Sequence, residues 1–309
     1  MYATDEQELL SNCVLCPREC GADRFAGGSG YCGIDACINV ASVCIHKGEE
    51  PVICGHNGIC NIFFTGCNLR CQYCQNYEIS LPKNRIKASY MFLDETLDAI
   101  EKCLLQGIKT IGFVSPMHVV PQVKAIIRGL NGRGLKPITV YNTNGYEKKE
   151  VIDSLEEIID IWLCDYKYAD ENLASMLSDA SNYPKIALNA LKRMYFLKGS
   201  TLQTDNDGTA TSGLIIRHLI IPGYVEESKK ILRSIADELS TGVHISLMSQ
   251  YTPTALVAGM KNLNRPLNRG EYDAIVKEMN ALGFRNGWIQ ELDSKYNYTP
   301  DFKKQHPFE

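Results

Sequence analysis

Short runs of β-branched and aromatic residues alternate with amphipathic segments over most of the chain, from about residue 57 onward. Runs of this kind, each about five residues long, predict β-strands. Each run is followed by a longer polar or amphipathic stretch, so the strands are expected to be separated by helices or loops. The expected strands are 61–65, 110–114, 137–141, 160–163, 214–218 and 244–248.

The segments between these runs carry apolar residues three and four positions apart, which predicts helices. One helix is expected to begin at a cap on Asp94 and to end at Gly107, and another to end at Gly132. Segment 199–213 is rich in Ser, Thr, Gly, Asn and Asp, so it predicts an exposed loop before the fifth strand.

Strands that alternate with helices favour an α/β fold with a parallel sheet. Six consecutive right-handed βα units predict an open, partial (βα)6 barrel, and a doubly wound open sheet would have the same number of strands. In both architectures ligands bind where the strands end at their carboxyl side. Functional residues are therefore expected directly after the predicted strands.

Cysteine changes the picture of the N-terminal part. The chain has 13 cysteines, and all but Cys103 and Cys164 lie between residues 13 and 74. An odd number cannot pair completely as disulfides, and clustered cysteines in a reducing compartment indicate metal or iron–sulfur ligation. We expect a cysteine-rich metal-binding region at 1–56, the barrel at 57–292 and a C-terminal tail at 293–309.

The spacing C-x3-C-x2-C occurs at Cys67, Cys71 and Cys74, directly after the first predicted strand. On a helix these positions would share one face as small buried residues. They would then extend over about 10 Å along the axis, which is too far for joint ligation, so shared binding requires a loop. Three thiolates on a four-iron cluster leave one iron without a protein ligand, and an open position indicates chemistry.

With the aromatic Tyr73 before its last cysteine, this loop resembles the signature of the radical S-adenosylmethionine (SAM) superfamily. Much of the chain is similar to its pyruvate formate-lyase activating enzyme-like members, particularly those with a cysteine-rich head. The similar stretches are 16–20, 62–80, 141–146, 165–167 and 217–223. The resemblance implies a [4Fe–4S] cluster whose open iron binds SAM, and one-electron cleavage of SAM to a 5'-deoxyadenosyl radical.

Eight residues are candidates for contacts with SAM because they lie in this loop or at strand ends. They are Tyr73, Ser115, Asn142, Asn144, Asp165, Lys167, Arg217 and Gln250. Asparagine amides can bind ribose or carboxylate groups, although Asn-Gly is also a common structural turn. No catalytic residue is assigned beyond these contacts.

Several of these candidates have a second interpretation. Ser115 lies where the superfamily often has a glycine-rich turn with an acidic residue, and a turn-stabilising role is the alternative. Asp165 and Lys167 resemble a pair beside the substrate in activating enzymes, and a simple ion pair is the alternative. Arg217 ends an apolar strand and needs an anionic partner, for which the cofactor carboxylate and Asp165 are the candidates.

A second group of cysteines precedes the barrel. The spacing Cys13-x2-Cys16-x3-Cys20-x11-Cys32 supplies four thiolates, which suit either a zinc ion or a second iron–sulfur cluster. The other cysteines of the region have no recognisable spacing and are Cys37, Cys44, Cys54 and Cys60.

Charge adds little. The 32 basic and 36 acidic residues are mixed along the chain, so no nucleic-acid partner is expected. Residues 1–11 are polar and acidic, unlike a signal peptide, and no apolar run of about 18 residues occurs. We expect a cytoplasmic enzyme without a membrane partner, supplied with electrons by a flavodoxin or ferredoxin.

Three functions remain open at this stage. The first is activation of a glycyl radical enzyme, but the chain lacks the Gly-Pro-Gly-x-Arg segment of activating enzymes, with 55–59 in its place, and a ferredoxin-like insert after Cys74. The second is radical modification of a peptide or small molecule. The third is a non-enzymatic iron–sulfur or zinc protein, which would not consume SAM.

Overall fold

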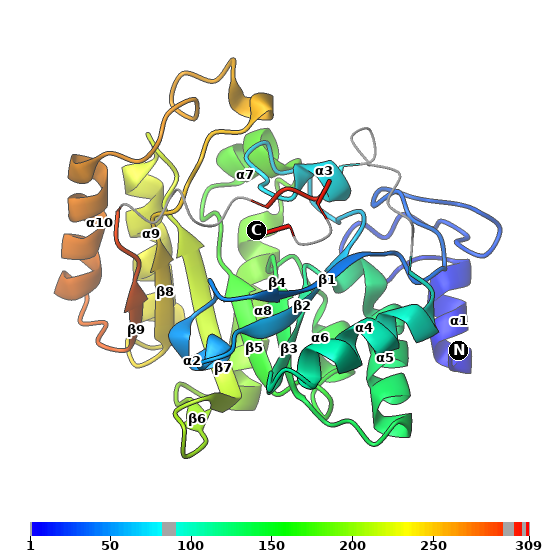
Figure 1. Ribbon diagram of the computed structural model, residues 1–309. Helices are drawn as coiled ribbons and strands as arrows, with labels where there is room; N and C mark the ends of the chain where they lie inside the picture. Colours follow the sequence, from blue (N-terminus) through cyan, green and yellow to red (C-terminus); the bar gives the residue numbers. More distant parts are fainter. Residues whose placement is uncertain (1, 82–90, 293–299, 305–306, 309) are drawn as a thin grey trace.

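The parallel strands of the sheet lie side by side in the order in which the chain forms them (Figure 1). The computed structural model describes residues 2–81, 91–292, 300–304 and 307–308. All six predicted strands are present as parallel members. The parallel strands are β2 (Ile59–Phe64), β3 (Thr110–Val114), β4 (Ile138–Thr143), β5 (Ile161–Asp165), β7 (Ala210–Leu219), β8 (His244–Met248) and β9 (Gly287–Ile289).

The strand order distinguishes between the two architectures that the sequence left open. Neighbours run β2-β3-β4-β5-β7-β8-β9 without a reversal, and each of these pairs is parallel. A doubly wound sheet reverses its strand order at a switch point, whereas successive right-handed units added on one side curl into a barrel. The fold is therefore α/β with a partial barrel, as predicted.

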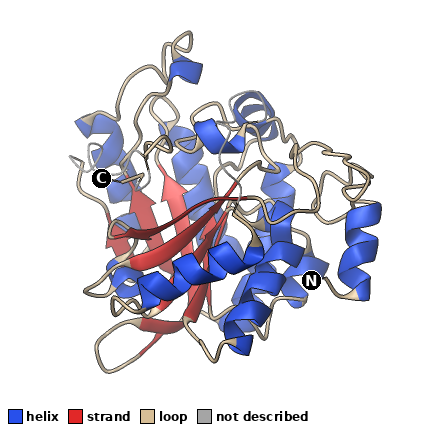
Figure 2. Cartoon of the chain, turned by 45° about the vertical axis from the view of Figure 1, so that its right-hand side comes forward, coloured by secondary structure: helices blue, strands red, loops and turns tan. Residues whose placement is uncertain are grey.

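Helices cover the outside of the sheet (Figure 2). They separate successive strands, which is why the strands can be parallel. The longer helices are α4 (Leu93–Leu104), α5 (Val120–Gly132), α7 (Glu171–Ser178), α8 (Tyr183–Lys198), α9 (Val225–Glu238) and α10 (Arg269–Ala281), and the shorter ones are α3 (Tyr77–Ser80) and α6 (Lys149–Asp153). The predicted cap at Asp94 is wrong, because α4 begins at Leu93 and its N-cap residue is Phe92.

The cysteine-rich region contributes to the sheet. After α1 (Thr4–Ser11), strand β1 (Val40–His46) pairs antiparallel with β2 and forms one edge of the sheet. The short helix α2 (Pro51–Cys54) follows it. The sequence did not predict β1, whose alternately buried and half-buried residues lie among irregularly spaced cysteines.

Two further strands differ from the prediction. Segment 199–213 is not a plain loop, because β6 (Gln203–Thr204) pairs with the start of β7 as a hairpin. Strand β9 forms the other edge of the sheet beside β8. Its three residues are too few for the alternation that marks longer strands.

The two faces of the sheet are packed differently, and the alternation along each strand decides which side chains face inward. Ile161, Leu163 and Ile215 pack with Ile53 of α2 in a small apolar cluster, and their strand neighbours pack in the large cluster with the helices. Side chains two residues apart share a face. Asn142, Asp165 and Arg217 therefore lie on the inner face of the sheet, the face against which α2 packs. They lie near the carboxyl ends of their strands.

A glycine in β3 makes room for this inner face. A Cβ on Gly112 would lie 2.2 Å from Oδ1 of Asn61 and 2.9 Å from Cδ1 of Ile59. The Asn61 amide donates to Glu49, 2.9 Å away, so it cannot move without losing that bond. Gly112 thus allows Asn61 to hold the segment that precedes α2.

We predict that Gly112→Ala destabilises the fold by about 1–3 kcal/mol, because the added methyl group overpacks a filled site. Gly132 is the matched control, since it ends α5 and nothing lies within 4 Å of its added Cβ. Gly132→Ala should be neutral or slightly stabilising. Urea unfolding of both variants under reducing conditions, followed by circular dichroism, measures the difference. Equal unfolding midpoints would contradict this role for Gly112.

Candidate functional site

A cavity of about 680 Å³ opens at the carboxyl ends of the parallel strands. Its lining comes from the cysteine loop, the ends of the strands, and the segment before α2. All eight candidate contact residues and the three cysteines of the C-x3-C-x2-C loop line this one cavity: Cys67, Cys71, Tyr73, Cys74, Ser115, Asn142, Asn144, Asp165, Lys167, Arg217 and Gln250. The structure therefore brings together every residue that the sequence singled out for this site.

The cysteine loop is held by its backbone and by one amide side chain. The N–H groups of Arg70 and Gln72 donate to carbonyls of Ser178 and Leu177 at the end of α7, at 3.2 and 2.8 Å. Asn68 is completely buried, and its Nδ2 donates to the carbonyl of Tyr146, 2.8 Å away. These contacts fix an irregular loop without help from helix or strand hydrogen bonds.

Each thiol of the loop has a polar neighbour. The Ser178 hydroxyl donates to Sγ of Cys71 at 3.0 Å, the Ser80 hydroxyl lies 3.3 Å from Sγ of Cys74, and the N–H of Leu69 donates to Sγ of Cys67 at 3.4 Å. Burial raises the pKa of Cys67 to about 12 and that of Cys74 to about 11. A bound metal would replace the protons of these thiols, because metals bind cysteine as the thiolate.

The three thiols of the loop line the same cavity. No group of three or more His, Cys, Asp or Glu side chains in the described ranges is arranged to hold one metal ion. The thiols nevertheless interact with one another electrostatically and face the same cavity. A four-iron cluster binds its thiolates at separate corners, so it accepts more widely spaced ligands. Three cysteines that line an open cavity fit such a cluster with one free iron.

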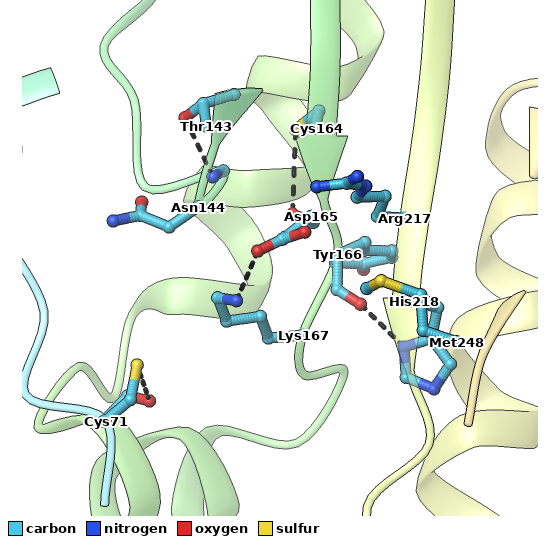
Figure 3. Close-up of polar contacts among 12 residues, drawn as sticks. Cys71, Thr143, Asn144, Cys164, Asp165, Tyr166, Lys167, Arg217, His218 and Met248 are labelled. Atoms are coloured by element: carbon cyan, nitrogen blue, oxygen red, sulfur yellow. Dashed lines mark hydrogen bonds and ion pairs between the residues drawn. The ribbon is translucent and has the colours of Figure 1, made fainter. Parts of the chain in front are cut away.

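Lys167 and Asp165 form an ion pair at the end of β5, with Nζ 2.5 Å from Oδ2, both side chains being about one-fifth exposed (Figure 3). Burial lowers the pKa of Lys167, but the Asp165 carboxylate and the Cys71 thiol outweigh it, so the pKa lies above its ordinary value. The cation also interacts with all three thiols of the loop. It is thus placed to stabilise negative charge on the sulfurs.

Arg217 has anionic partners that the sequence did not identify. Its guanidinium binds both Glu49 and Glu50, which precede α2, and Nε lies 2.7 Å from Oε1 of Glu50. Asp165 interacts with Arg217 but is paired with Lys167 (Figure 3). The two partners considered from sequence were Asp165 and a cofactor carboxylate, so the prediction missed the glutamates. Their signal was weak, because two acidic residues in a loop are usually solvated.

Asn142, near the end of β4, and Asn144, directly after it, make different contacts. Nδ2 of Asn144 donates to Oδ1 of Asn68 at 2.7 Å and approaches Sγ of Cys67 at 3.6 Å, while its Oδ1 accepts from the N–H of Tyr146. Asn144 therefore orients the cysteine loop through its contacts with Asn68 and Cys67. Asn142 lines the cavity, and its carbonyl accepts from the N–H of Ser115 at 2.7 Å.

Tyr73 connects the cavity wall to a cysteine. Its hydroxyl lies 2.7 Å from that of Tyr168, which lies 2.6 Å from the Ser178 hydroxyl, and Ser178 donates to Cys71. This buried chain of hydroxyls orients the donor that faces the sulfur. Neither Tyr168, in the loop after β5, nor Ser178, the last residue of α7, was predicted, since neither belongs to a motif.

The last two candidates lie on opposite sides of the cavity. Ser115 has a φ of 49°, a left-handed conformation that is uncommon for a residue other than glycine. Its position supports the alternative of a tight turn after β3. Gln250 follows β8, and its Oε1 accepts from Nε2 of Gln290 at 2.8 Å, which joins the ends of β8 and β9.

The N-terminal cysteines form a separate group. Cys13, Cys16 and Cys32 are buried, whereas Cys20 is exposed. Cys13 interacts electrostatically with Cys20 and Cys32, and Cys16 interacts with Cys13 and Cys32. The fold thus brings together four thiols that the sequence spaces over 20 positions.

Known proteins resemble this chain in sequence. Residues 61–199 match the family model of the Radical SAM superfamily. An uncharacterized protein of Methanocaldococcus jannaschii is 26% identical over 295 residues, covering 94% of this chain and 77% of that protein. No helix in the described parts of the chain is long and apolar enough to span a lipid bilayer.

Crystal structures of SuiB from Streptococcus suis share the fold. One is bound to the precursor peptide SuiA, with a TM-score of 0.50 and 12% identity over 74% of this chain and 48% of SuiB. Another is bound to S-adenosylmethionine, with a TM-score of 0.50 and 11% identity over 74% of this chain and 50% of SuiB. This chain spans about half the length of SuiB, and the similarity concerns the fold alone.

We predict that Arg217→Met costs about 3–5 kcal/mol of folding free energy, because it leaves two buried carboxylates without their cation. Lys109 provides the control, since it pairs with Asp205 and Asp207 at the surface. Lys109→Met should change the free energy of unfolding far less, because water screens the exposed pair. Denaturant titration of both variants tests this, and similar losses would show that the Arg217 cluster contributes no special stability.

Glu147 should give the fold a dependence on pH. It is buried behind Asn144 and accepts from the hydroxyls of Thr143 and Tyr141, and burial raises its pKa to about 8. The native state keeps a proton that the unfolded chain releases above its ordinary pKa of 4.5. This contribution is complete below pH 4.5 and declines as the pH rises to about 8, by about 1.4 kcal/mol per unit.

Glu147→Gln removes the ionisable group and keeps one carbonyl acceptor, as in the protonated carboxyl group. The variant should therefore gain stability relative to the wild type as the pH rises from about 5 to about 8. Unfolding free energies measured across this range check the slope. A difference that is independent of pH would refute the raised pKa.

Proposed function

Because residues 61–199 match the family model of the Radical SAM superfamily, we propose that the chain is an enzyme that cleaves SAM reductively and uses the 5'-deoxyadenosyl radical to abstract hydrogen. In this proposal Cys67, Cys71 and Cys74 hold a [4Fe–4S] cluster. The observation that supports it is that the three thiols and all eight candidate contact residues line one cavity. The site lies at the carboxyl ends of the strands, where barrels bind their ligands.

When bound, the cluster supplies one electron to the sulfonium of SAM, and the carbon–sulfur bond breaks to give methionine and the 5'-deoxyadenosyl radical. The chain's residues bind and orient. Lys167 places a half-buried cation beside the three sulfurs, Ser178 donates to Cys71, and the Ser80 hydroxyl lies within hydrogen-bond distance of Cys74. Asn142 lines the cavity with an amide that suits the ribose or carboxylate of SAM.

Charged groups of both signs line the cavity. Glu49, Glu50 and Asp165 carry three negative charges, against three positive charges on Lys47, Lys167 and Arg217. A cavity with both signs suits SAM, which carries a sulfonium, an ammonium and a carboxylate group. The ion pairs keep the paired groups fixed, so they cost no reorganisation when the cofactor binds.

The cavity extends to both edges of the sheet. Its lining includes His46 at the end of β1, Trp288 in β9 and Gln290 after β9. We propose that the acceptor of the radical is presented between these edges. A glycine of a glycyl radical enzyme is the first candidate, from the resemblance in sequence, and a peptide or small molecule is the second.

Two further expectations belong to the same proposal. The electron comes from a flavodoxin or ferredoxin. The chain is divided into a cysteine-rich region (1–56), a barrel (57–292) and a tail (293–309). Residues 293–299, 305–306 and 309 lie outside the described residues. Strand β1 and the Glu49–Arg217 contact nevertheless join the N-terminal region to the barrel.

We predict that the anaerobically reconstituted chain, reduced with dithionite, converts SAM to 5'-deoxyadenosine. Cys67→Ala/Cys71→Ala/Cys74→Ala should abolish this product, because no ligands remain for the cluster. Cys37→Ala is the control, since Cys37 is exposed and outside the cavity. Chromatography of the product measures both. Undiminished product in the triple variant would eliminate the proposal, and inactive wild type would favour a non-enzymatic protein.

The acceptor requires its own experiment. Reduced enzyme and SAM are incubated with glycyl radical enzymes of the source organism, and electron paramagnetic resonance (EPR) detects a glycyl radical. A radical that depends on SAM identifies an activating enzyme. Absence of a radical with every such enzyme eliminates activation and leaves the peptide or small-molecule alternative.

A further inference from the structure

Arg24 is a buried cation beside the N-terminal cysteines. Only 2% of it is exposed. Its Nη1 donates to the carbonyl of His118 at 2.6 Å, its Nη2 donates to Sγ of Cys32 at 3.4 Å, and its Nε has no hydrogen-bond partner. No carboxylate in the described part of the chain forms a salt bridge with it. An uncompensated buried guanidinium is costly, so this position requires an anion.

The four thiols are the groups that can supply that anion. Arg24 interacts electrostatically with Cys13, Cys16 and Cys20 and hydrogen-bonds to Cys32. Four neutral thiols would leave the cation unbalanced. Four thiolates around a metal centre carry net negative charge, which would balance it. Arg24 therefore indicates that these cysteines bind metal as thiolates.

Gly30 packs closely against Cys20. A Cβ on Gly30 would lie 2.6 Å from Sγ of Cys20, so position 30 has no room for a side chain. Cys13 is fixed by two backbone hydrogen bonds, from its N–H to Ala22 and from Gly21 to its carbonyl, both at 3.0 Å. The two loops that carry the four cysteines are thus held against each other.

Four thiolates suit either a zinc ion or a four-iron cluster. No group of three or more His, Cys, Asp or Glu side chains among the described residues is arranged to hold a metal ion. The choice between the two metals therefore rests on how the N-terminal cysteines are connected to the radical-site loop.

Two arginines connect the N-terminal cysteines to the radical-site loop. Arg18, between Cys16 and Cys20, donates from Nε to the carbonyl of Asn68 at 3.0 Å. Arg70, between Cys67 and Cys71, donates from Nη2 to the carbonyl of Tyr31 at 2.6 Å. The Tyr31 ring contacts both guanidinium groups, with centroid distances of 3.9 and 4.5 Å. Each cysteine loop thus binds the backbone of the other.

We propose that Cys13, Cys16, Cys20 and Cys32 hold a second [4Fe–4S] cluster, that Arg24 balances its charge, and that it passes electrons to the radical site. A reduced flavodoxin or ferredoxin loses one electron, the N-terminal cluster gains it, and the cluster on the cysteine loop then receives it. Cys20 is the exposed ligand and faces the donor. The relay rests on the proposed function, whereas the binding of a second cluster does not.

Metal content tests the binding of the second cluster. The full chain, reconstituted anaerobically with iron and sulfide, should hold about eight irons, since each [4Fe–4S] cluster has four. Cys13→Ala/Cys16→Ala and Cys67→Ala/Cys71→Ala/Cys74→Ala should each hold about four. If the second variant holds no iron, or one zinc per chain occupies the N-terminal cysteines, the second cluster is refuted. If only the first variant holds none, the proposed function is refuted instead.

The charge of Arg24 can be tested without deleting a ligand. Arg24→Met should shift the reduction potential of the N-terminal cluster to more negative values, because reduction adds negative charge that the arginine stabilises. Arg24→Lys should restore it, and Arg128→Met is the control, since Arg128 pairs with Glu6 on α1. Potentiometric titration followed by EPR measures the shift. An unchanged potential in Arg24→Met would overturn the electrostatic role.

The relay predicts that loss of the N-terminal cluster lowers the rate more with reduced flavodoxin than with dithionite. Cys13→Ala/Cys16→Ala should lose about tenfold more rate with reduced flavodoxin than with dithionite, when each rate is compared with that of the wild type. Dithionite is small and reaches the radical site directly, whereas flavodoxin needs a docking site. Equal rates with flavodoxin in the variant and the wild type would overturn the relay.

Discussion

Asn68 connects three parts of the chain that are far apart in sequence. Its Nδ2 donates to the carbonyl of Tyr146, its Oδ1 accepts from Asn144, and its own carbonyl accepts from Arg18. The residue is completely buried, so removal of any one of these partners would leave a buried polar group without a hydrogen bond. The direction in which Cys67 points therefore depends on the loop after β4 and on the N-terminal region together.

The inner face of the sheet explains why charged groups can be held rigidly in a buried site. Alternation along the strands places Asp165 and Arg217 on the same side as α2, with apolar residues below them. There Glu49 and Glu50 approach from the segment before α2, and Asn61 holds Glu49. A buried arginine with two carboxylates needs such exact placement, since desolvation is repaid only by good geometry. The N-terminal region thus completes the site.

Sequence patterns predicted the part of this arrangement that depends on local rules. Five-residue apolar runs identified all parallel strands except β9, and the positions after strand ends identified residues that share one cavity. Contacts between distant segments could not be predicted in this way. Glu49, Ser178 and Tyr168 have roles that depend on the distant segments packed beside them. Neither the periodicity of apolar residues nor the spacing of motifs shows which segments these are. For the same reason the partner of Arg217 was missed.

The two cysteine groups place a buried cation beside their sulfurs in different ways. Lys167 has a carboxylate of its own in Asp165, so it is compensated before any metal binds. Arg24 has no carboxylate partner among the described residues, and a thiol is its only charged or chargeable hydrogen-bond partner. The N-terminal group thus depends more strongly on bound metal for its charge balance than the radical-site loop does. Because Arg18 joins that group to Asn68, metal in the N-terminal group would also stabilise the loop that holds Cys67.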